Sequence, residues 1–164
     1  QARVPVVQDG DRVVFDSWSI AEYLEDRYPQ PSLFGGMTGQ AHARFLNAWA
    51  DSVLLPGIAR FIVRDLVDVI DPKDAEYFRS SREQRFGATL EAVQAGREER
   101  LPALRELLTP ARLVLRRQAW FGGTTASYAD HIIAGTLMWP RCASRFKLLQ
   151  ADDLYSNKPE DSVP

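Results

Sequence analysis

Two short, mostly apolar runs rich in β-branched residues open the chain, and a helical pattern of apolar positions follows them. The runs cover residues 4–7 and 12–15, and the polar segment between them contains Asp9 and Gly10. Two such runs around an Asp-Gly step predict a β-hairpin. Over residues 20–28 the apolar side chains recur every three or four positions. This spacing predicts a helix directly after the hairpin.

A connector rich in proline and glycine then interrupts the pattern at residues 29–36. Such residues end a helix and separate structural units. Beyond the connector the apolar positions keep a helical spacing, and over 86–115 they predict one long helix with kinks at Pro102 and Pro110. We therefore expect a mostly α fold, with a mixed α/β unit before the connector and an all-helical domain after it.

These boundaries divide the chain into three parts. We assign residues 1–34 to the α/β unit and residues 35–155 to the helical domain. The stretch 156–164 is polar and punctuated by prolines, so we expect it to be a disordered tail.

Ser127 and Asp130 follow a glycine pair at 122–123. A phosphate-binding loop is not indicated, because the lysine and the preceding strand of such a loop are absent around these glycines. The spacing predicts instead an N-terminal capping box, in which Asp130 accepts a hydrogen bond from the backbone N–H of Ser127. We expect this box to begin a helix.

Composition narrows the functional classes. The 164 residues are 45% hydrophobic, and the formal net charge of −2 gives no bias towards nucleic acid or an anionic membrane.

The single cysteine, Cys142, argues against a disulfide framework and suits a reducing compartment, and we expect it to be buried on a helix. His42 and His131 lack neighbouring ligands, so no metal site is predicted. No apolar run reaches membrane-spanning length and no leader is recognisable, which predicts a cytoplasmic protein.

Pro5 and the Asp16-Ser17 pair stand at the ends of predicted elements, where each has two interpretations. As structural residues, Pro5 opens an edge strand and the pair caps a helix. As functional residues, a cis Val4-Pro5 bond turns the backbone of Val4 outward to pair with an extended peptide. Ser17 then donates to a ligand carboxylate at the helix N-terminus, and Asp16 accepts from a ligand ammonium. The head group of an α-amino acid has both of these charges.

The sequence around these residues resembles the glutathione S-transferases. The resemblance lies in the Val-Pro strand, the Asp-Gly turn, the Asp-Ser pair, Ile20-Ala21-x-Tyr23-Leu24 and Tyr28-Pro29-x-Pro31-x-Leu33-Phe34. The helical remainder is similar too, so the resemblance covers most of residues 3–150. Residues 77–87 look most like the fungal and bacterial branch related to β-etherases.

The resemblance implies a thioredoxin-like glutathione-binding domain, here represented by its C-terminal half, and an all-α glutathione-transferase C-terminal domain. In the family the proline is cis, the residue before it pairs with the cysteinyl part of glutathione, and the acidic-serine pair holds the γ-glutamyl end. These roles fall on Val4, Pro5, Asp16 and Ser17. The family's leading strand-helix-strand unit contains the residue that activates the glutathione thiol. Because the chain opens directly at the Val-Pro strand, we expect this unit and its catalytic residue to be missing.

Two functions remain open. One is a glutathione transferase that joins the glutathione thiolate to an apolar electrophile, by conjugation or by ether cleavage, with this chain supplying glutathione binding but not thiol activation. The other is a non-catalytic, transferase-like binding or dimerisation module. The resemblance implies a homodimer. Trp49, Arg60, Arg64 and Trp139 are candidates for a co-substrate cleft, but aromatic residues at helical spacing are more often core, and we leave these four out of the site.

Overall fold

The computed structural model describes residues 4–150 and 153, and this part of the chain is mostly helical, as predicted. A two-stranded sheet, β1 (Val6–Asp9) and β2 (Arg12–Phe15), comes first. The α-helices that follow are α1 (Ser17–Arg27), α2 (Met37–Trp49), α3 (Leu55–Ile62), α4 (Pro72–Phe86), α5 (Leu90–Gln94), α6 (Arg97–Leu107), α7 (Thr109–Leu115) and α8 (Tyr128–Ala143). Two shorter elements complete the order, the π-helical η1 (Ala50–Leu54) and the 3-10 helical η2 (Asp65–Asp68). The tail expected at 156–164 lies outside the described residues.

The predicted hairpin forms, and α1 lies against it. Strands β1 and β2 are antiparallel, with Asp9 opposite Arg12, and Gly10 takes the positive φ of 58° that the tight turn requires. The hydroxyls of Tyr23 and Tyr28 donate to the Asp9 carboxylate at 2.6 and 3.0 Å. These bonds hold the pKa of Asp9 below its ordinary value. The hairpin is therefore attached to the helix whose first residue is Ser17.

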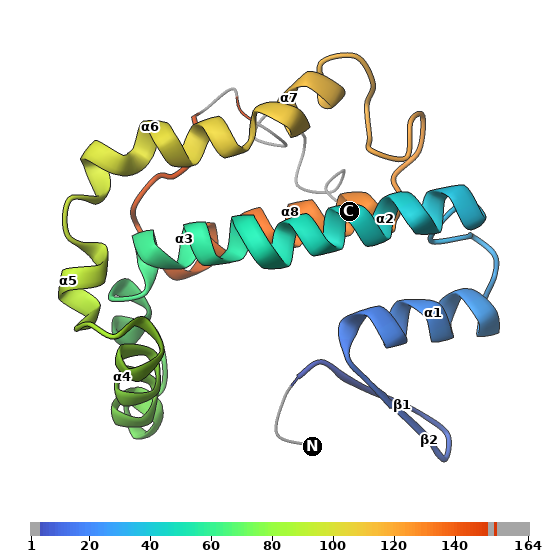
Figure 1. Cartoon of the computed structure of the whole chain (residues 1–164). Coiled ribbons are helices and arrows are strands. Elements are labelled where there is room, and N and C mark those ends of the chain that lie inside the picture. Colours follow the sequence, from blue (N-terminus) through green and yellow to red (C-terminus); the bar gives the residue numbers. More distant parts are fainter. Residues whose placement is uncertain (1–3, 151–152, 154–164) are drawn as a thin grey trace.

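A long, continuous helix formed by α2, η1 and α3 crosses the molecule (Figure 1). Pro56 lies in the first turn of α3 and has no backbone N–H to donate. In the wider turn of η1, the N–H of Leu55 reaches back to the carbonyl of Ala50. Because the π-helical turn accommodates the proline, the helix continues past Pro56, a residue that ordinarily bends or interrupts a helix.

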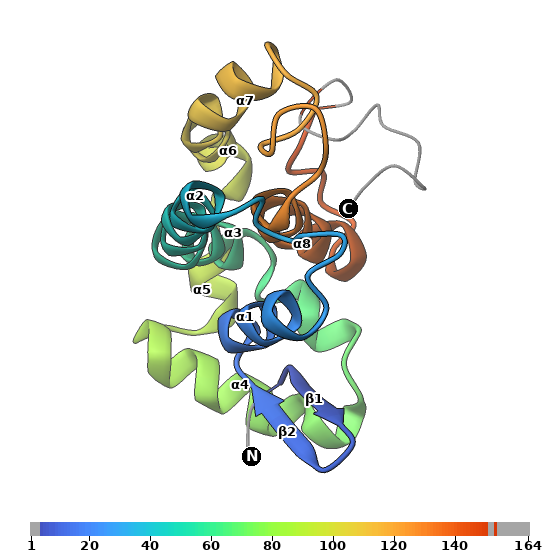
Figure 2. The same cartoon turned by 90° about the vertical axis from the view of Figure 1, so that its right-hand side faces the viewer.

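The hydrophobic core lies where this long helix packs beside α8, with α6 and α7 across them (Figures 1 and 2). Leu54, Ile62 and Ile133 are at most 1% exposed. Burial of each such side chain contributes about 1.5–3 kcal/mol. This core fixes the relative positions of the helices that surround the candidate site.

One predicted helix is wrong: the stretch 86–115 contains the last residue of α4 and then α5, α6 and α7, rather than a single kinked helix. One break comes at Gly96, which has a φ of 64°, and none at Pro102, which lies inside α6; a second break separates α6 from α7 next to Pro110, where a kink was predicted. Arg100 donates to the carbonyls of Val93 and Ala95 at 3.0 and 2.9 Å, so the end of α5 is satisfied without a continuing helix. The apolar positions keep their helical spacing on both sides of Gly96, so the hydrophobic pattern gives no sign of the break there.

The expected burial of Cys142 is also wrong, because its side chain is exposed on α8. Its neighbours Pro140 and Ala143 are buried, so they face the core and Cys142 lies on the opposite side of the helix.

Candidate functional site

Val4 and Pro5 come immediately before β1. Their peptide bond is cis, as the resemblance implies. Val4 is 90% exposed and lies ahead of the strand pairing, which starts with Val6 opposite Phe15. The backbone of Val4 is therefore placed beside a strand end, where an extended ligand can reach it.

Asp16 caps α1 in an unusual backbone conformation. Its Oδ1 accepts hydrogen bonds from the N–H groups of Trp18 and Ser19 at 3.1 and 3.0 Å. Its φ of 74° is positive, and Asp16 is the one non-glycine residue with this property among those that the structure describes. Such a conformation costs on the order of 1–3 kcal/mol and is concentrated at functional sites. The capping role is thus present, but it does not require this strained backbone.

The geometry leaves polar groups free at the N-terminus of α1. Asp16 and Ser17 are both exposed. Within the described part of the chain, no hydrogen bond uses Oδ2 of Asp16 or the hydroxyl of Ser17. The positive end of the helix dipole also attracts an anion to this position. The structure therefore brings together an acceptor for an ammonium and a donor for a carboxylate.

Tyr128, at the start of α8, joins the helical layer to this helix end. Its hydroxyl donates to the backbone carbonyl of Ser17 at 3.0 Å, and its ring meets those of Trp18 and Phe34 edge-on at 5.9 and 5.5 Å. Burial, followed by the negative charges of Asp16 and Asp51, raises the pKa of Tyr128, although the bond to Ser17 opposes the shift. At neutral pH the phenol therefore keeps its proton and holds Ser17.

The predicted Ser127-Asp130 box forms and positions Tyr128. Asp130 is fully buried and accepts from the N–H groups of Phe121, Gly122 and Ser127 at 2.7, 3.1 and 2.9 Å. One carboxylate therefore fixes both the start of α8 and the preceding loop.

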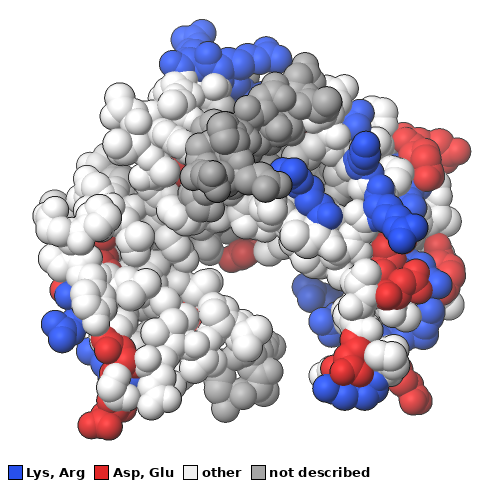
Figure 3. Space-filling view, turned by 180° about the vertical axis from the view of Figure 1, so that it is seen from behind, with Lys and Arg blue, Asp and Glu red and all other residues white. Residues whose placement is uncertain are grey.

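A second candidate feature is a pocket of about 450 Å³ between α3, α4, η1 and α8, which we call the arginine pocket. Three arginines and three aromatic side chains are prominent in its lining: Arg60, Arg82, Arg85, Phe78, Phe86 and Trp139. Arg60 lies over the ring of Phe86 at 5.6 Å, and Arg82 lies over that of Phe78 at 4.7 Å. Figure 3 shows the molecule from behind, with a hollow between two lobes. Basic side chains lie on the inner wall of the lobe at the lower right.

Of the four residues that we set aside as cleft candidates, Arg60 and Trp139 do line this pocket. The residues contributed by α4 were missed. Phe78, Arg82 and Phe86 are four residues apart, which places them on one helix face. That spacing could have shown that the three residues share a face of α4. It could not show that this face borders a pocket, because that depends on which helices pack beside α4.

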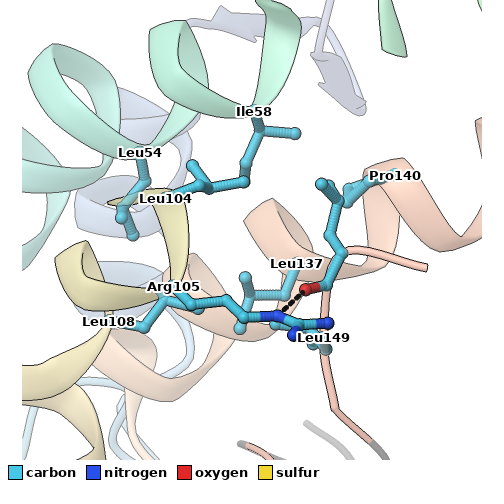
Figure 4. Close-up of a pocket in the computed structure, with 9 residues that line it drawn as sticks. Leu54, Ile58, Leu104, Arg105, Leu108, Leu137, Pro140 and Leu149 are labelled. Atoms are coloured by element: carbon cyan, nitrogen blue, oxygen red, sulfur yellow. Dashed lines mark hydrogen bonds between the residues drawn. The ribbon is translucent and has the colours of Figure 1, made fainter. Parts of the chain in front are cut away.

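A much smaller gap lies inside the core and has a different character (Figure 4). Its volume is about 10 Å³, roughly the space of one water molecule, and its lining includes Leu54, Leu104 and Leu137. Arg105 closes one side by donating from Nε to the carbonyl of Leu148 at 2.9 Å. This gap is a packing feature and is too small for a substrate.

Neither a metal-binding cluster nor a membrane-spanning helix is found among the described residues. No group of three or more His, Cys, Asp or Glu side chains there is arranged to hold a metal ion. None of the helices in the same residues has the length and apolar character needed to cross a membrane.

Comparison with known families gives two matches along the chain. The family model for the glutathione S-transferase C-terminal domain matches residues 41–151, and the model for the N-terminal domain of the same family matches residues 1–32. Glutathione S-transferase Z2 of Arabidopsis thaliana is 42% identical over 55 residues, which are 34% of this chain and 23% of that protein.

Solved structures agree with these matches. Glutathione transferase GSTFuA3 from Phanerochaete chrysosporium superimposes with a TM-score of 0.77 and 30% identity, covering 87% of this chain and 59% of the solved chain. Glutathione S-transferase CsGST63524 of Ceriporiopsis subvermispora, solved in complex with glutathione, has a TM-score of 0.76 and 25% identity, covering 86% and 60%. The chain thus spans about a quarter of the Arabidopsis relative and about three fifths of the solved chains.

Proposed function

The chain belongs to the glutathione S-transferase family, and from this premise we propose that Val4, Pro5, Asp16 and Ser17 bind glutathione for a transferase reaction. The observation that supports the proposal most is the exposed Asp16-Ser17 pair at the N-terminus of α1, held in a strained backbone conformation. The Ser17 hydroxyl, at the positive end of the α1 dipole, receives the γ-glutamyl carboxylate, and the free Oδ2 of Asp16 receives the ammonium. The backbone of Val4 pairs with the cysteinyl part of the tripeptide.

In the proposed reaction the bound glutathione gives up its thiol proton and attacks an electrophilic carbon of an apolar co-substrate. A carbon–sulfur bond forms and the bond to the leaving group breaks, releasing a halide in a substitution or an alkoxide in the ether cleavage of the β-etherase-related branch. The thiolate is the nucleophile, so a group that stabilises it is essential. We assign that role to no described residue; the hydroxyl of Tyr128, which lies beside the site, donates to the backbone carbonyl of Ser17.

Replacement of Ser17 by alanine tests the binding site. We expect glutathione affinity to fall by about 1.5–3 kcal/mol, because a charge-assisted hydrogen bond is lost. Isothermal titration calorimetry measures this difference. Ser19→Ala is the matched control, since Ser19 is exposed in the same first turn but is assigned no ligand contact. Equal affinities of the wild type and the Ser17 variant would reduce Ser17 to a helix-start residue.

A conjugation assay separates binding from catalysis. We expect the chain of residues 1–164 to bind glutathione without accelerating its reaction with a chloronitrobenzene. Turnover above the rate in buffer would contradict the proposal that thiol activation comes from outside these residues. In the natural gene, a Ser, Tyr or Cys in a strand ahead of the Val-Pro strand supports the enzyme, whereas an apolar residue at that place favours a non-catalytic module. A homodimer in the cytoplasm completes the proposal, and analytical ultracentrifugation tests the dimer.

A further inference from the structure

The arginine pocket has more positive charge than its own lining neutralises. Arg64, just outside it, is ion-paired with Asp68 at 3.0 Å and Glu91 at 3.2 Å. In contrast, Arg60, Arg82 and Arg85 form no ion pair with any carboxylate in the described residues. These three guanidinium groups give the pocket a surplus of donors for an anion.

One carboxylate, that of Asp51, also lines the pocket. It is exposed and accepts a hydrogen bond from the side-chain amide of Asn47 at 2.8 Å. With a single Asp51 charge against three arginines, the lining keeps a net positive charge. An anionic ligand is therefore favoured over a cationic one.

The remaining walls suit an aromatic ring. Phe78, Phe86 and Trp139 lie among aliphatic side chains, and the guanidinium groups of Arg60 and Arg82 lie over two of these rings. A volume of about 450 Å³ accommodates a small organic molecule. Aromatic walls with cationic groups among them match a flat ring that has an acidic substituent.

The arginine pocket is bordered by α4, which lies on the same side of the long helix as α1 and the hairpin (Figure 1). Tyr128 donates to the backbone of Ser17 in that site, and its phenol experiences the charges of both Asp16 and Asp51. Tyr128 thus lies within electrostatic reach both of Asp16 in the glutathione site and of Asp51 at the edge of the pocket.

We propose that the arginine pocket binds the co-substrate, and that this co-substrate is an aromatic electrophile bearing a carboxylate or a comparable anionic group. The inference rests on the proposed function and narrows its apolar co-substrate to one whose aromatic body carries a single anionic group. The anionic substituent binds the guanidinium groups while the electrophilic carbon points towards the glutathione sulfur. With a chloronitrobenzoate, for example, the carbon–sulfur bond forms, the carbon–chlorine bond breaks, chloride leaves, and the thiol proton passes to solvent.

Titration of the full chain with 2-naphthoate and with its neutral analogue 2-naphthamide tests the charge preference. We expect calorimetry to show about tenfold or greater preference for the naphthoate, which is the scale of one charge-assisted hydrogen bond. Equal affinity for the two probes, or a preference for the amide, would overturn the proposal.

Substitutions of the three pocket arginines test whether these residues cause the preference for naphthoate. Because Arg82 is the half-buried member of the three, Arg82→Met should weaken naphthoate binding about tenfold. Arg60 and Arg85 are exposed, so Arg60→Met and Arg85→Met should each weaken it about threefold. Binding of 2-naphthamide should not change in these variants, which shows that the pocket is intact. Arg141→Met, an exposed arginine on α8 outside the pocket, is the control. If Arg82→Met also loses the amide, the double variant of Arg60 and Arg85 decides the question, and unchanged naphthoate affinity there refutes the role of the arginines.

Glutathione itself is a second anion and must be distinguished from the co-substrate. We expect naphthoate affinity to be retained in saturating glutathione, because the two ligands occupy different sites. Displacement of naphthoate by glutathione would overturn the inference and assign the arginines to glutathione. Failure of glutathione to bind at all, with naphthoate still bound, would defeat the proposed function, while glutathione binding without a naphthoate preference would defeat only this inference.

Discussion

Asp130 is the carboxylate on which the start of α8 and the preceding loop depend, so its replacement should be among the most damaging in the protein. Its side chain is fully buried and accepts three backbone N–H bonds, of 2.7 to 3.1 Å, together with one from the Ser127 hydroxyl at 3.2 Å. In Asp130→Ala all four acceptor contacts disappear. Water can rehydrate the donor of the exposed Gly122, but the N–H of the buried Phe121 is left without a partner.

We expect Asp130→Ala to lower the free energy of unfolding by about 3–5 kcal/mol. The unpaired, buried N–H of Phe121 accounts for about 1–3 kcal/mol of this, and the lost bonds from Gly122 and Ser127 account for the rest. Asp130→Asn keeps one carbonyl oxygen and should lose about 2 kcal/mol. Urea unfolding followed by far-ultraviolet circular dichroism measures both, provided that the slope with denaturant is unchanged.

The comparison variant is Asp71→Ala. Asp71 also caps a helix, α4, but it is exposed and accepts one backbone bond, from Lys73 at 3.0 Å. Its loss should cost about 0.5–1 kcal/mol. A cost below about 1 kcal/mol for Asp130→Ala, or equal costs at the two sites, would refute the argument from burial and multiple bonds.

Three further results are expected. Leu54→Ala, at a site 1% exposed, should destabilise the protein by about 2–5 kcal/mol in urea, and a cost under 1 would mean that the core closes over the lost volume. Burial raises the pKa of Asp65, but hydrogen bonds from Ser144 and Arg97, among others, outweigh it, and the net pKa is lowered. Asp65 therefore stabilises the fold above its unfolded pKa of about 4, and this contribution is lost as pH falls through the lower folded pKa. Asp65→Asn should thus reduce stability at pH 7 and flatten its acid dependence; an unchanged pH profile would contradict this. Cys142 should react with a thiol reagent in the folded state, and reaction only on unfolding would contradict its exposure.

The elements predicted correctly were those whose signals are local. The hairpin around Asp9 and Gly10, the cap at Asp16 and the box of Ser127 and Asp130 each depend on residues within a few positions of one another. Local backbone geometry and hydrogen bonding are sufficient to specify such features. The roles of Val4, Pro5, Asp16 and Ser17 came from the family resemblance, and their glutathione contacts stay predictions.

The errors and omissions involve partners far apart in the chain. Arg97 lies inside the stretch predicted as one helix, yet its guanidinium donates to the carbonyl of Phe61 and to the carboxylate of Asp65 at 3.0 and 2.8 Å. Those contacts anchor the start of α6 after the break at Gly96. No periodicity in residues 86–115 contains this information, because the bonds span more than thirty positions.

Local sequence thus specified the strands, the starts of α1 and α8, and the polar pair that we propose for glutathione. The arginine pocket, the Tyr128 bond to Ser17 and the outward position of Cys142 required the folded chain, since each depends on which helix faces lie together. Short-range hydrogen bonds and turn conformations act between near neighbours, whereas burial and pocket shape arise when residues as distant as Asp51 and Trp139 pack around one space.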